Sequence, residues 1–342
     1  MFRDTFIRTA LSLPVLDSLF YKLLETKYQK HQTTFDVRNF ATARNWFIRT
    51  SSPSGKESTQ WGDTYFAEDL AAAFSELGIS ANDFFRDQIL QKELRANAVV
   101  LTIRGVVPMR PIAGAINILW IISHPAQLTK RELKQFDFVF AASESWAHKY
   151  SKKWKVPIST LLQATNSNLF NTSAVPQNRA NNLLFVGNTR GIHRSAVRTA
   201  SVSRDDLVVV GKGWEKYISR KQIKDQSLTH EQVANEYKNT KVVLCDHWSD
   251  MATQGFISNR IFDALACGAT VISDYVAGIE NYFNNSVITY NNPSELEVIL
   301  KEVFSSDSEN PVSQEVADDI AKNHTFLNRA KALISEANKI KV

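Results

Sequence analysis

Small and cationic residues end or follow two stretches that we expect to form buried strands, at 181–187 and 206–211. Ligands of open parallel sheets bind where strands end, so these positions are informative. Glycine lets backbone N–H groups approach a ligand, and N–H dipoles with Arg or Lys neutralise a diphosphate. Neither stretch is a Walker A loop or a complete GxGxxG motif, and a solvated surface position is nearly as common for the two cations. The candidate anion ligands are Gly187, Asn188, Arg190, Lys212 and Gly213.

A helix followed by a buried strand is expected at 255–274, GFISNRIFDALACGATVISD. Ser258 stands at the N-cap position of that helix. A helix start presents N–H groups and a positive dipole end to an anion, so Ser258, Asn259 and Arg260 are further candidates. Asp263, about a turn and a half along the helix, can accept hydrogen bonds from sugar hydroxyls. Taken alone, however, the segment favours an ordinary helix–strand unit of a parallel sheet.

The first half of the chain places Asp63, His124 and Glu144 after expected strands. A histidine and two carboxylates at strand ends can transfer protons. Each also has a structural explanation, because Glu144 can cap its helix and His124, which precedes Pro125, can satisfy a backbone carbonyl. The sequence shows no histidine pair at metal-binding spacing, no serine nucleophile elbow and no cysteine nucleophile with a partner. Metal catalysis and covalent acyl chemistry are therefore not indicated.

Expected strands and helices alternate from residue 35 onward, which indicates an α/β protein with parallel sheets wrapped by helices. One of the expected helices lies around residues 82–94, and a polar stretch at 163–179 is the best candidate for a linker. After this linker the same alternation restarts. We expect an N-terminal helical segment at 1–34, an α/β domain at 35–170, a second at 178–310, and C-terminal helices at 311–342 that pack back towards the first domain.

The composition is that of a globular protein, with 342 residues of which 44% are hydrophobic, enough for two cores. The net charge is +5, but 40 basic and 35 acidic residues are intermixed, so nucleic-acid binding is not indicated. Cys245 and Cys267 lie in apolar surroundings, and no signal peptide or membrane span is evident. We expect a cytoplasmic protein whose amphipathic N-terminus packs on the protein body or, as the alternative, rests on the inner membrane face.

The segment SNRIFDALACGATVISDYVAGIENYF at 258–283 resembles the nucleotide-sugar domain of GT-B glycosyltransferases (glycosyl transferases group 1), especially the bacterial CgeB-like and family-4-like group. WGDTYFAEDLAAAFSELG, INILWIISHP and NHTFLNRAKALI resemble other parts of the same enzymes, so the likeness spans most of residues 43–335. It implies two Rossmann-like domains facing across a cleft. The second domain would hold a nucleoside-diphosphate sugar, and the first an acceptor.

The resemblance also implies roles for donor-binding residues. Asp263 matches the acid that contacts the ribose hydroxyls in family-4-like enzymes. Gly255 stands where those enzymes have a second acid that contacts the donor sugar, so that contact is absent here. Arg190 and Lys212 lie roughly where the group places its diphosphate-binding cations. The implied chemistry needs charge neutralisation on the leaving diphosphate, with no metal and no cofactor besides the donor substrate.

Residues of the first half would serve the acceptor side of the same reaction. His124 would contact the donor sugar or the developing charge. Transfer with inversion requires a base, for which Asp63 is the first choice and Glu144 or His124 the next. Retention with front-side attack requires no dedicated base. The two stereochemical outcomes stay open.

Three hypotheses follow for the function. The first is a glycosyltransferase that acts on a glycan or lipid-linked glycan acceptor in cell-surface polysaccharide synthesis, with peripheral membrane contact allowed by the basic charge balance. The second is a sugar-nucleotide epimerase or another nucleotide-sugar enzyme on the same plan, which would turn over the donor without an acceptor. The third is a non-enzymatic two-domain binding protein, which the lack of a signal peptide disfavours.

Overall fold

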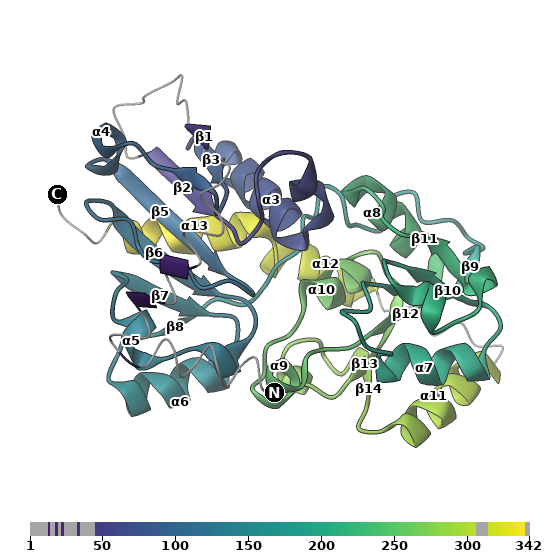
Figure 1. Cartoon of the computed structure of the whole chain (residues 1–342). Helices are drawn as coiled ribbons and strands as arrows, with labels where there is room; N and C mark the ends of the chain where they lie inside the picture. Colours follow the sequence, from purple (N-terminus) through teal and green to yellow (C-terminus); the bar gives the residue numbers. More distant parts are fainter. Residues whose placement is uncertain are drawn as a thin grey trace. The chain divides into compact units, whose positions relative to one another are not determined.

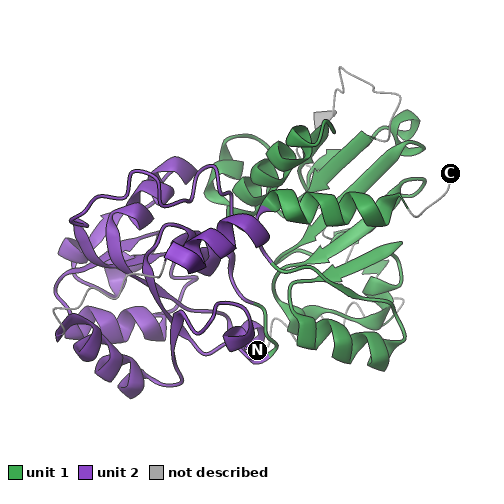
Figure 2. Ribbon diagram, turned by 180° about the vertical axis from the view of Figure 1, so that it is seen from behind, with its two compact units in different colours: residues 1–162, 254–256, 326–342 green, residues 163–253, 257–325 purple. Residues whose placement is uncertain are grey.

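A computed structural model describes the residues 13, 18–19, 22–23, 33–34, 45–305 and 314–338. The chain forms two compact units, shown in separate colours in Figure 2. The first contains the described residues among Met1–Leu162, Gln254–Phe256 and Phe326–Val342, and the second those among Gln163–Thr253 and Ile257–Thr325. The helical segment expected at 1–34, with its amphipathic face, lies almost wholly outside the described residues.

The first unit is built on a six-stranded sheet in which every pair of neighbours is parallel (Figure 1). In spatial order the strands are β3 (Ala81–Phe84), β2 (Asn45–Arg49), β5 (Ala98–Arg104), β6 (Ile116–Ile121), β7 (Phe138–Ala141) and β8 (Ser159–Thr160). The chain runs from β2 outward to β3 and later returns to the other side of β2 with β5. The strand order therefore reverses between β2 and β5. A separate pair joins β1 (Thr33–Thr34) to β4 (Gln88–Ile89).

Helices of the first unit pack on this sheet and on each other. Phe66 contacts both Trp120 of β6 and Phe326 edge to face, with ring centroids 5.2 and 4.8 Å apart. The described helices and 3-10 turns include η2 (Gly55–Gln60), α3 (Gly62–Glu76), α4 (Lys92–Arg95), η3 (Pro125–Gln127), α5 (Lys130–Leu133), α6 (Glu144–Trp154) and α13 (Phe326–Ala337). Of these, α13 lies along α3.

The expectation of a helix around 82–94 is wrong, because only the last residues of this segment are helical. The segment begins with β3, continues through β4 and ends in the short α4. Phe84 is buried and meets Phe47 of β2 edge to face, with ring centroids 6.2 Å apart, and Leu90 and Leu94 join the same apolar cluster. Burial of Phe84 beside β2 thus places the segment at the sheet edge and overrides its helical pattern.

The sheet of the second unit also has six parallel strands, and its order is that of a doubly wound nucleotide-binding domain. In spatial order they are β11 (Ile223–Asp225), β10 (Leu207–Val210), β9 (Asn181–Val186), β12 (Thr240–Cys245), β13 (Thr270–Asp274) and β14 (Val287–Tyr290). The chain starts at β9, builds outward to β11, and then continues on the other side of β9. Here the strand order reverses between β9 and β12.

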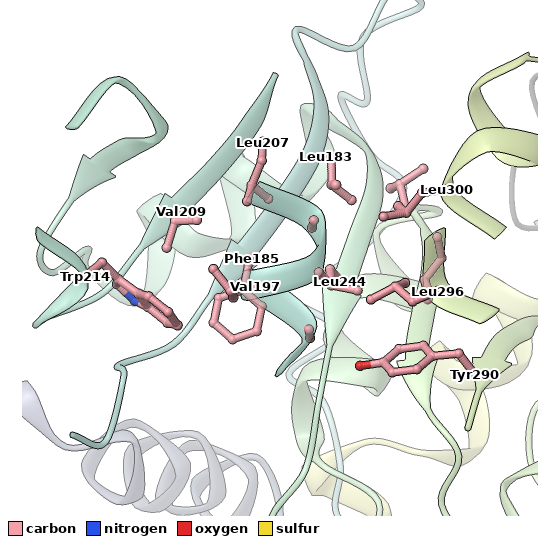
Figure 3. Packing of buried hydrophobic residues seen from close by; sticks show 14 of the residues in the cluster. Leu183, Phe185, Val197, Leu207, Val209, Trp214, Leu244, Tyr290, Leu296 and Leu300 are labelled. Atoms are coloured by element: carbon pink, nitrogen blue, oxygen red, sulfur yellow. The ribbon is translucent and has the colours of Figure 1, made fainter. Parts of the chain in front are cut away.

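Apolar side chains of β9, β10 and β12 form a core with α7 (Ser195–Ser203) and α11 (Pro293–Ser305), as Figure 3 shows. The two helices lie side by side. Other described helices and turns of this unit are η4 (Trp214–Lys216), η5 (Arg220–Gln222), α8 (His230–Lys238), α9 (Ser249–Thr253), α10 (Asn259–Ala266), η6 (Ile279–Asn281) and α12 (Gln314–Asn323). α12 packs on α10 in this unit, whereas α13 belongs to the first unit.

The helix and strand expected at 255–274 correspond to α10 and β13, with Ser258 in an extended N-cap conformation. Ile261, Phe262 and Leu265 are fully buried, and the helix ends before Gly268, whose φ of +67° suits glycine. Both cysteines are buried and free. Among the described helices, none has the length and apolar character needed to cross a bilayer.

Phe185→Ala tests the core of the second unit. Phe185 is fully buried and meets Trp214 edge to face, with ring centroids 5.6 Å apart. Truncation should lower the free energy of unfolding by about 3–5 kcal/mol through lost burial and the cavity left behind. Urea denaturation measures the change. The control is Val202→Ala, which removes an 86% exposed side chain and should change stability by less than about 0.5 kcal/mol. Equal effects of the two substitutions would contradict this description of the core.

Candidate functional site

A buried ion pair lies where the strand order of the second sheet reverses, between β9 and β12. Arg194, at the N-cap of α7, donates from Nε to Asp246 Oδ2 over 2.9 Å and from Nη2 to Asp246 Oδ1. Its Nη1 also donates to the carbonyl of Asn188 over 3.0 Å. Burial and the charges of Arg260 and Arg190 lower the pKa of Arg194. A guanidinium held this way joins the segment that follows β9 to the residue that follows β12.

The loops that follow β9 and β10 are joined by backbone and side-chain hydrogen bonds. Thr189 N–H donates to the Lys212 carbonyl over 3.1 Å, and Lys212 N–H donates to Asn188 Oδ1 over 2.8 Å. Trp214 Nε1 donates to the Gly187 carbonyl over 2.7 Å. The structure therefore brings Gly187, Asn188 and Lys212 together, as strand-end reasoning anticipates. Gly213, with a φ of +85°, packs against Thr189.

Arg260 links the start of α10 to the same strand ends. Its Nη1 donates to the carbonyl of Val186 over 3.1 Å, and its Nη2 donates to the carbonyl of Asp246 over 2.9 Å. Its Nε donates to Ser258 Oγ over 3.2 Å. Arg260 therefore has several backbone and side-chain acceptors, and it holds β9, β12 and α10 in one arrangement.

Arg190 is the most accessible of the three arginines at this site. It is exposed, has a left-handed φ of +59°, and its guanidinium lies 4.3 Å from the ring centroid of Trp248. Loss of surrounding water and the charge of Arg260 lower its pKa to about 9, so it stays charged at neutral pH. No residue in the described part of the chain accepts a hydrogen bond from its guanidinium. An anion can therefore bind there without displacing a protein acceptor.

The backbone N–H groups at the start of α10 already have protein acceptors. Ser258 N–H donates to His247 Nε2 and Asn259 N–H donates to Gln163 Oε1, each over 3.0 Å. The sequence prediction that these two groups meet an anion would thus require the anion to displace His247 and Gln163. An anion bound to Arg190 would not have to displace a protein acceptor.

Asp263 lies on α10 with 5% of its surface exposed, and its Oδ2 accepts a hydrogen bond from Asn259 Nδ2 over 3.2 Å. The expected ribose contact stays a prediction. Gly255 belongs to the first unit and has a φ of +74°. Its neighbour Gln254 accepts a hydrogen bond from Ser143 Oγ over 2.7 Å. An acidic side chain at position 255 would be strained in this conformation, which explains why a glycine occupies the position.

Asp63 lies at the reversal point of the first sheet, in the first turn of α3. A methyl group added to Gly105, which follows β5, would lie only 2.8 Å from Asp63 Oδ2 and 3.4 Å from Ser51 Oγ. Burial raises the pKa of Asp63 to about 6. No hydrogen bond from a residue in the described part of the chain reaches its carboxylate, and the buried hydroxyl of Ser51 likewise has no partner there. This carboxylate is thus suited to exchange a proton near neutral pH.

A second buried ion pair supports the loop that Asp63 contacts. Arg104, the last residue of β5, donates from Nε to Glu132 Oε1 over 2.6 Å and from Nη1 to the carbonyl of Gly105 over 2.5 Å. Both charged side chains are fully buried. Such a pair gives little net stability, because desolvation offsets the attraction, but it fixes the Gly105 backbone beside Asp63.

The other two acid–base candidates occupy different surroundings. His124 follows β6 in a left-handed conformation with a φ of +54°, and its Nδ1 lies 2.9 Å from Ser123 Oγ. A left-handed residue directly before proline is unusual, so the surrounding structure holds His124 in place. Glu144 is exposed at the first position of α6, where Ser143 rather than Glu144 caps the helix by accepting from Trp146 N–H.

Strand-end reasoning missed Asp246, His247 and Asp274. The first two follow β12 directly, and Asp274 is the last residue of β13, so the rule that identified Lys212 would also have found them. No group of three or more His, Cys, Asp or Glu side chains among the described residues could hold a metal ion.

Residues 190–335 match a family model described as glycosyl transferase-like. The matched range begins in the loop after β9 and ends within α13. No curated protein matches the chain by sequence. The family match therefore covers the arginine site but not the sheet of the first unit.

Solved structures are similar over both units. A glycosyltransferase from Rickettsia africae and sucrose-phosphate synthase from Thermosynechococcus elongatus each align over 86% of this chain and 98% of their own, with 11% identity and TM-scores of 0.56 and 0.61. The T4 phage β-glucosyltransferase in complex with UDP and Mn²⁺ aligns over 86% of this chain and 100% of its own, with 12% identity and a TM-score of 0.54. These structural neighbours show that the chain has the GT-B fold.

Gly211→Ala tests the junction of the loops after β9 and β10. A methyl group at Gly211 would lie 2.2 Å from the Gly187 carbonyl oxygen, so the β9 loop must move. The matched control is Gly191→Ala, which also replaces a glycine with positive φ but meets nothing within 4 Å. We expect Gly211→Ala to be less stable than Gly191→Ala by about 1–3 kcal/mol in urea denaturation. Similar losses for both would show that the junction tolerates the methyl group.

Proposed function

We propose that this protein transfers a sugar from a nucleoside-diphosphate sugar to an acceptor hydroxyl. The second unit would bind the donor, and the first unit would bind the acceptor. The observation that carries the proposal is the accessible guanidinium of Arg190 at the strand reversal of the second sheet, beside Arg194, Arg260 and Lys212. A diphosphate is the ligand that such a site suits best.

The charge balance of the site supports an anionic ligand. The site has four cations, of Arg190, Arg194, Arg260 and Lys212, and three carboxylates, of Asp246, Asp263 and Asp274, which leaves an excess of one positive charge. The mutual repulsion contributes to the lowered pKa values of Arg190 and Arg194. A bound diphosphate would relieve that repulsion, and the relief would grow as the leaving group gains charge in the transition state.

The reaction forms a bond between the acceptor oxygen and the anomeric carbon, and breaks the bond from that carbon to the diphosphate oxygen. The electron pair of the broken bond stays on the nucleoside diphosphate, where Arg190 and Lys212 would neutralise it. In an inverting reaction the hydroxyl proton passes to the carboxylate of Asp63. With a pKa of about 6, that carboxylate is mostly ionised at pH 7 and above. His124 and Glu144 are the alternatives, and a retaining reaction would use none of the three.

The proposed acceptor is a more specific inference, and it rests on the resemblance of the sequence to GT-B glycosyltransferases. We infer a bacterial CgeB-like or family-4-like enzyme that works on a glycan or lipid-linked glycan in cell-surface polysaccharide synthesis, in the cytoplasm and with peripheral contact to the inner membrane face. Asp263 would contact the donor ribose. We further propose that the reaction needs no metal ion or cofactor, because the arginine site supplies the positive charge. Loss of activity in EDTA that Mn²⁺ restores would refute this last point.

An epimerase on the same plan is the alternative for the same donor site. The two functions differ in their need for an acceptor, because an epimerase would convert the nucleotide sugar alone. Incubation of the purified protein with nucleotide sugars, with and without saccharide acceptors, distinguishes them. Conversion of the donor into its epimer without an acceptor would replace the transferase proposal.

Arg190→Ala should weaken nucleoside-diphosphate binding about 10- to 100-fold, because charge-assisted hydrogen bonds to the diphosphate are lost. A thermal-shift screen of UDP, GDP, ADP and CDP against the wild-type protein first identifies the nucleotide, and calorimetry then gives the dissociation constants. Arg198→Ala is the matched control, because it removes an exposed arginine from α7 in the same unit. Unchanged affinity in Arg190→Ala would remove Arg190 from the proposed site.

Asp63→Asn should lower the transfer rate about 100- to 10,000-fold and leave nucleotide affinity unchanged. The wild-type rate should rise with pH around an apparent pKa of about 6, as the carboxylate becomes ionised. The raised pKa also means that the folded state binds more protons than the unfolded state between pH 3.8 and 6, so the carboxylate's burial costs stability as pH rises through that window. Asp63→Asn should therefore be more stable than wild type at pH 7.5. An unaltered transfer rate would exclude Asp63 as the base.

A further inference from the structure

A continuous chain of hydrogen bonds connects the ends of three neighbouring strands in the second unit. It starts at Asp274 of β13, passes through His247 after β12 to Ser258 at the start of α10, and continues through Arg260 to Val186 of β9. His247 joins Asp274 to the Ser258 end of this chain, and its contacts do not follow from the sequence. The strands involved, β9, β12 and β13, are adjacent in the sheet.

The contacts of His247 define its protonation state. Its Nδ1 lies 2.6 Å from Asp274 Oδ1, its backbone N–H donates to Asp274 Oδ2 over 3.0 Å, and its Nε2 accepts from Ser258 N–H over 3.0 Å. Because a backbone N–H can only donate, Nε2 must carry a lone pair. Because the Asp274 carboxylate can only accept, Nδ1 must carry the proton. The buried imidazole is therefore neutral and in the Nδ1–H form.

We propose that His247 is a positioning residue for the donor site: through Ser258 it holds Arg260 and the start of α10 in the arrangement that receives the diphosphate. This inference rests on the proposed function and deepens it. His247 itself is not expected to touch the ligand. It acts through the N–H of Ser258, whose hydroxyl accepts from Arg260 Nε over 3.2 Å. The acceptor atom Nε2 is thus the functional part of the side chain.

The surrounding charges favour the neutral imidazole that this role requires. Burial lowers the pKa of His247 and outweighs the opposing effect of Asp274, and the charges of Arg260 and Arg190 lower it further. Burial is the largest single effect on Asp274 and opposes its ionisation, but the interactions with His247 and the hydrogen bond from Ser273 together lower the pKa of Asp274. A proton added to Nε2 would replace an acceptor by a donor that faces the Ser258 N–H. It would also place another positive charge beside the arginines.

Two substitutions test the two ring nitrogens of His247 separately. In His247→Asn the amide nitrogen can replace Nδ1 as a donor to Asp274, but nothing replaces Nε2. In His247→Gln the longer side chain can place its oxygen near the position of Nε2, so that Ser258 N–H keeps an acceptor. We expect His247→Asn to weaken binding of the nucleoside diphosphate selected from UDP, GDP, ADP and CDP by about tenfold, and His247→Gln by less than about threefold.

Calorimetry on the folded variants decides between the outcomes. Equal affinity in wild type and both variants, or an equal loss in both, would overturn the role of Nε2. A wild-type protein that binds none of the four nucleotides would instead refute the proposed donor site. The pH dependence adds a further readout. Acidic pH that protonates His247, whose pKa burial holds below its usual value, should lower wild-type affinity, whereas His247→Gln should lose this component.

Nuclear magnetic resonance of the wild-type protein tests the same contacts without any substitution. At pH 7 the nitrogen shifts of His247 should show the neutral Nδ1–H form, and a scalar coupling should connect Nε2 to the amide nitrogen of Ser258. A charged imidazole or the Nε2–H form at pH 7 would overturn the inference even if a variant failed to fold.

Discussion

A parallel sheet places the carboxyl ends of all its strands at one edge, and the rest of this structure depends on that constraint. Where the strand order reverses, the two chains leaving the neighbouring strands diverge to opposite faces and leave room for side chains between them. Both units place charged side chains at that point: Asp63, beside Gly105, between β2 and β5, and Arg194 with Asp246 between β9 and β12. The same topology therefore produces a carboxylate with a raised pKa in one unit and a cluster of guanidiniums in the other.

The buried and the exposed arginines of the second unit have different roles. Arg194 and Arg260 donate to Asp246 and to the carbonyls of the strand ends, so they maintain the site. Arg190 is an exposed residue whose guanidinium stacks on the Trp248 ring. A buried charge with partners on several elements has one favourable position, whereas an exposed charge is available to a ligand. The first unit uses the same device, since Arg104 and Glu132 fix the backbone of Gly105 from within.

Much of the fold could be predicted from the sequence, because alternation of apolar runs and amphipathic segments is a local signal. The strands around β9, β10 and β12 and the helix at α10 follow from it. The segment at 82–94 could not be predicted in this way, because its strand depends on Phe47, a residue far away in the sequence. Strand-end reasoning also places Arg190 and Lys212 in the loops after β9 and β10, where the structure has them. It could not show that Gln163 and His247 accept the N–H groups of α10, because such partners depend on tertiary distances.

The two units are discontinuous in sequence, since the chain passes between them after Leu162, Thr253, Phe256 and Thr325. Four crossings mean that no single cut in the polypeptide separates one unit from the other. A fragment ending at residue 162 would lack α13, whose Phe326 ring packs on Phe66. A fragment starting at 163 would carry the three-residue insertion 254–256 without its Ser143 partner. Gene fusion or exchange of a single terminal half between homologous enzymes would therefore break covalent continuity within a core, and only a swap that respects all four junctions would preserve both units.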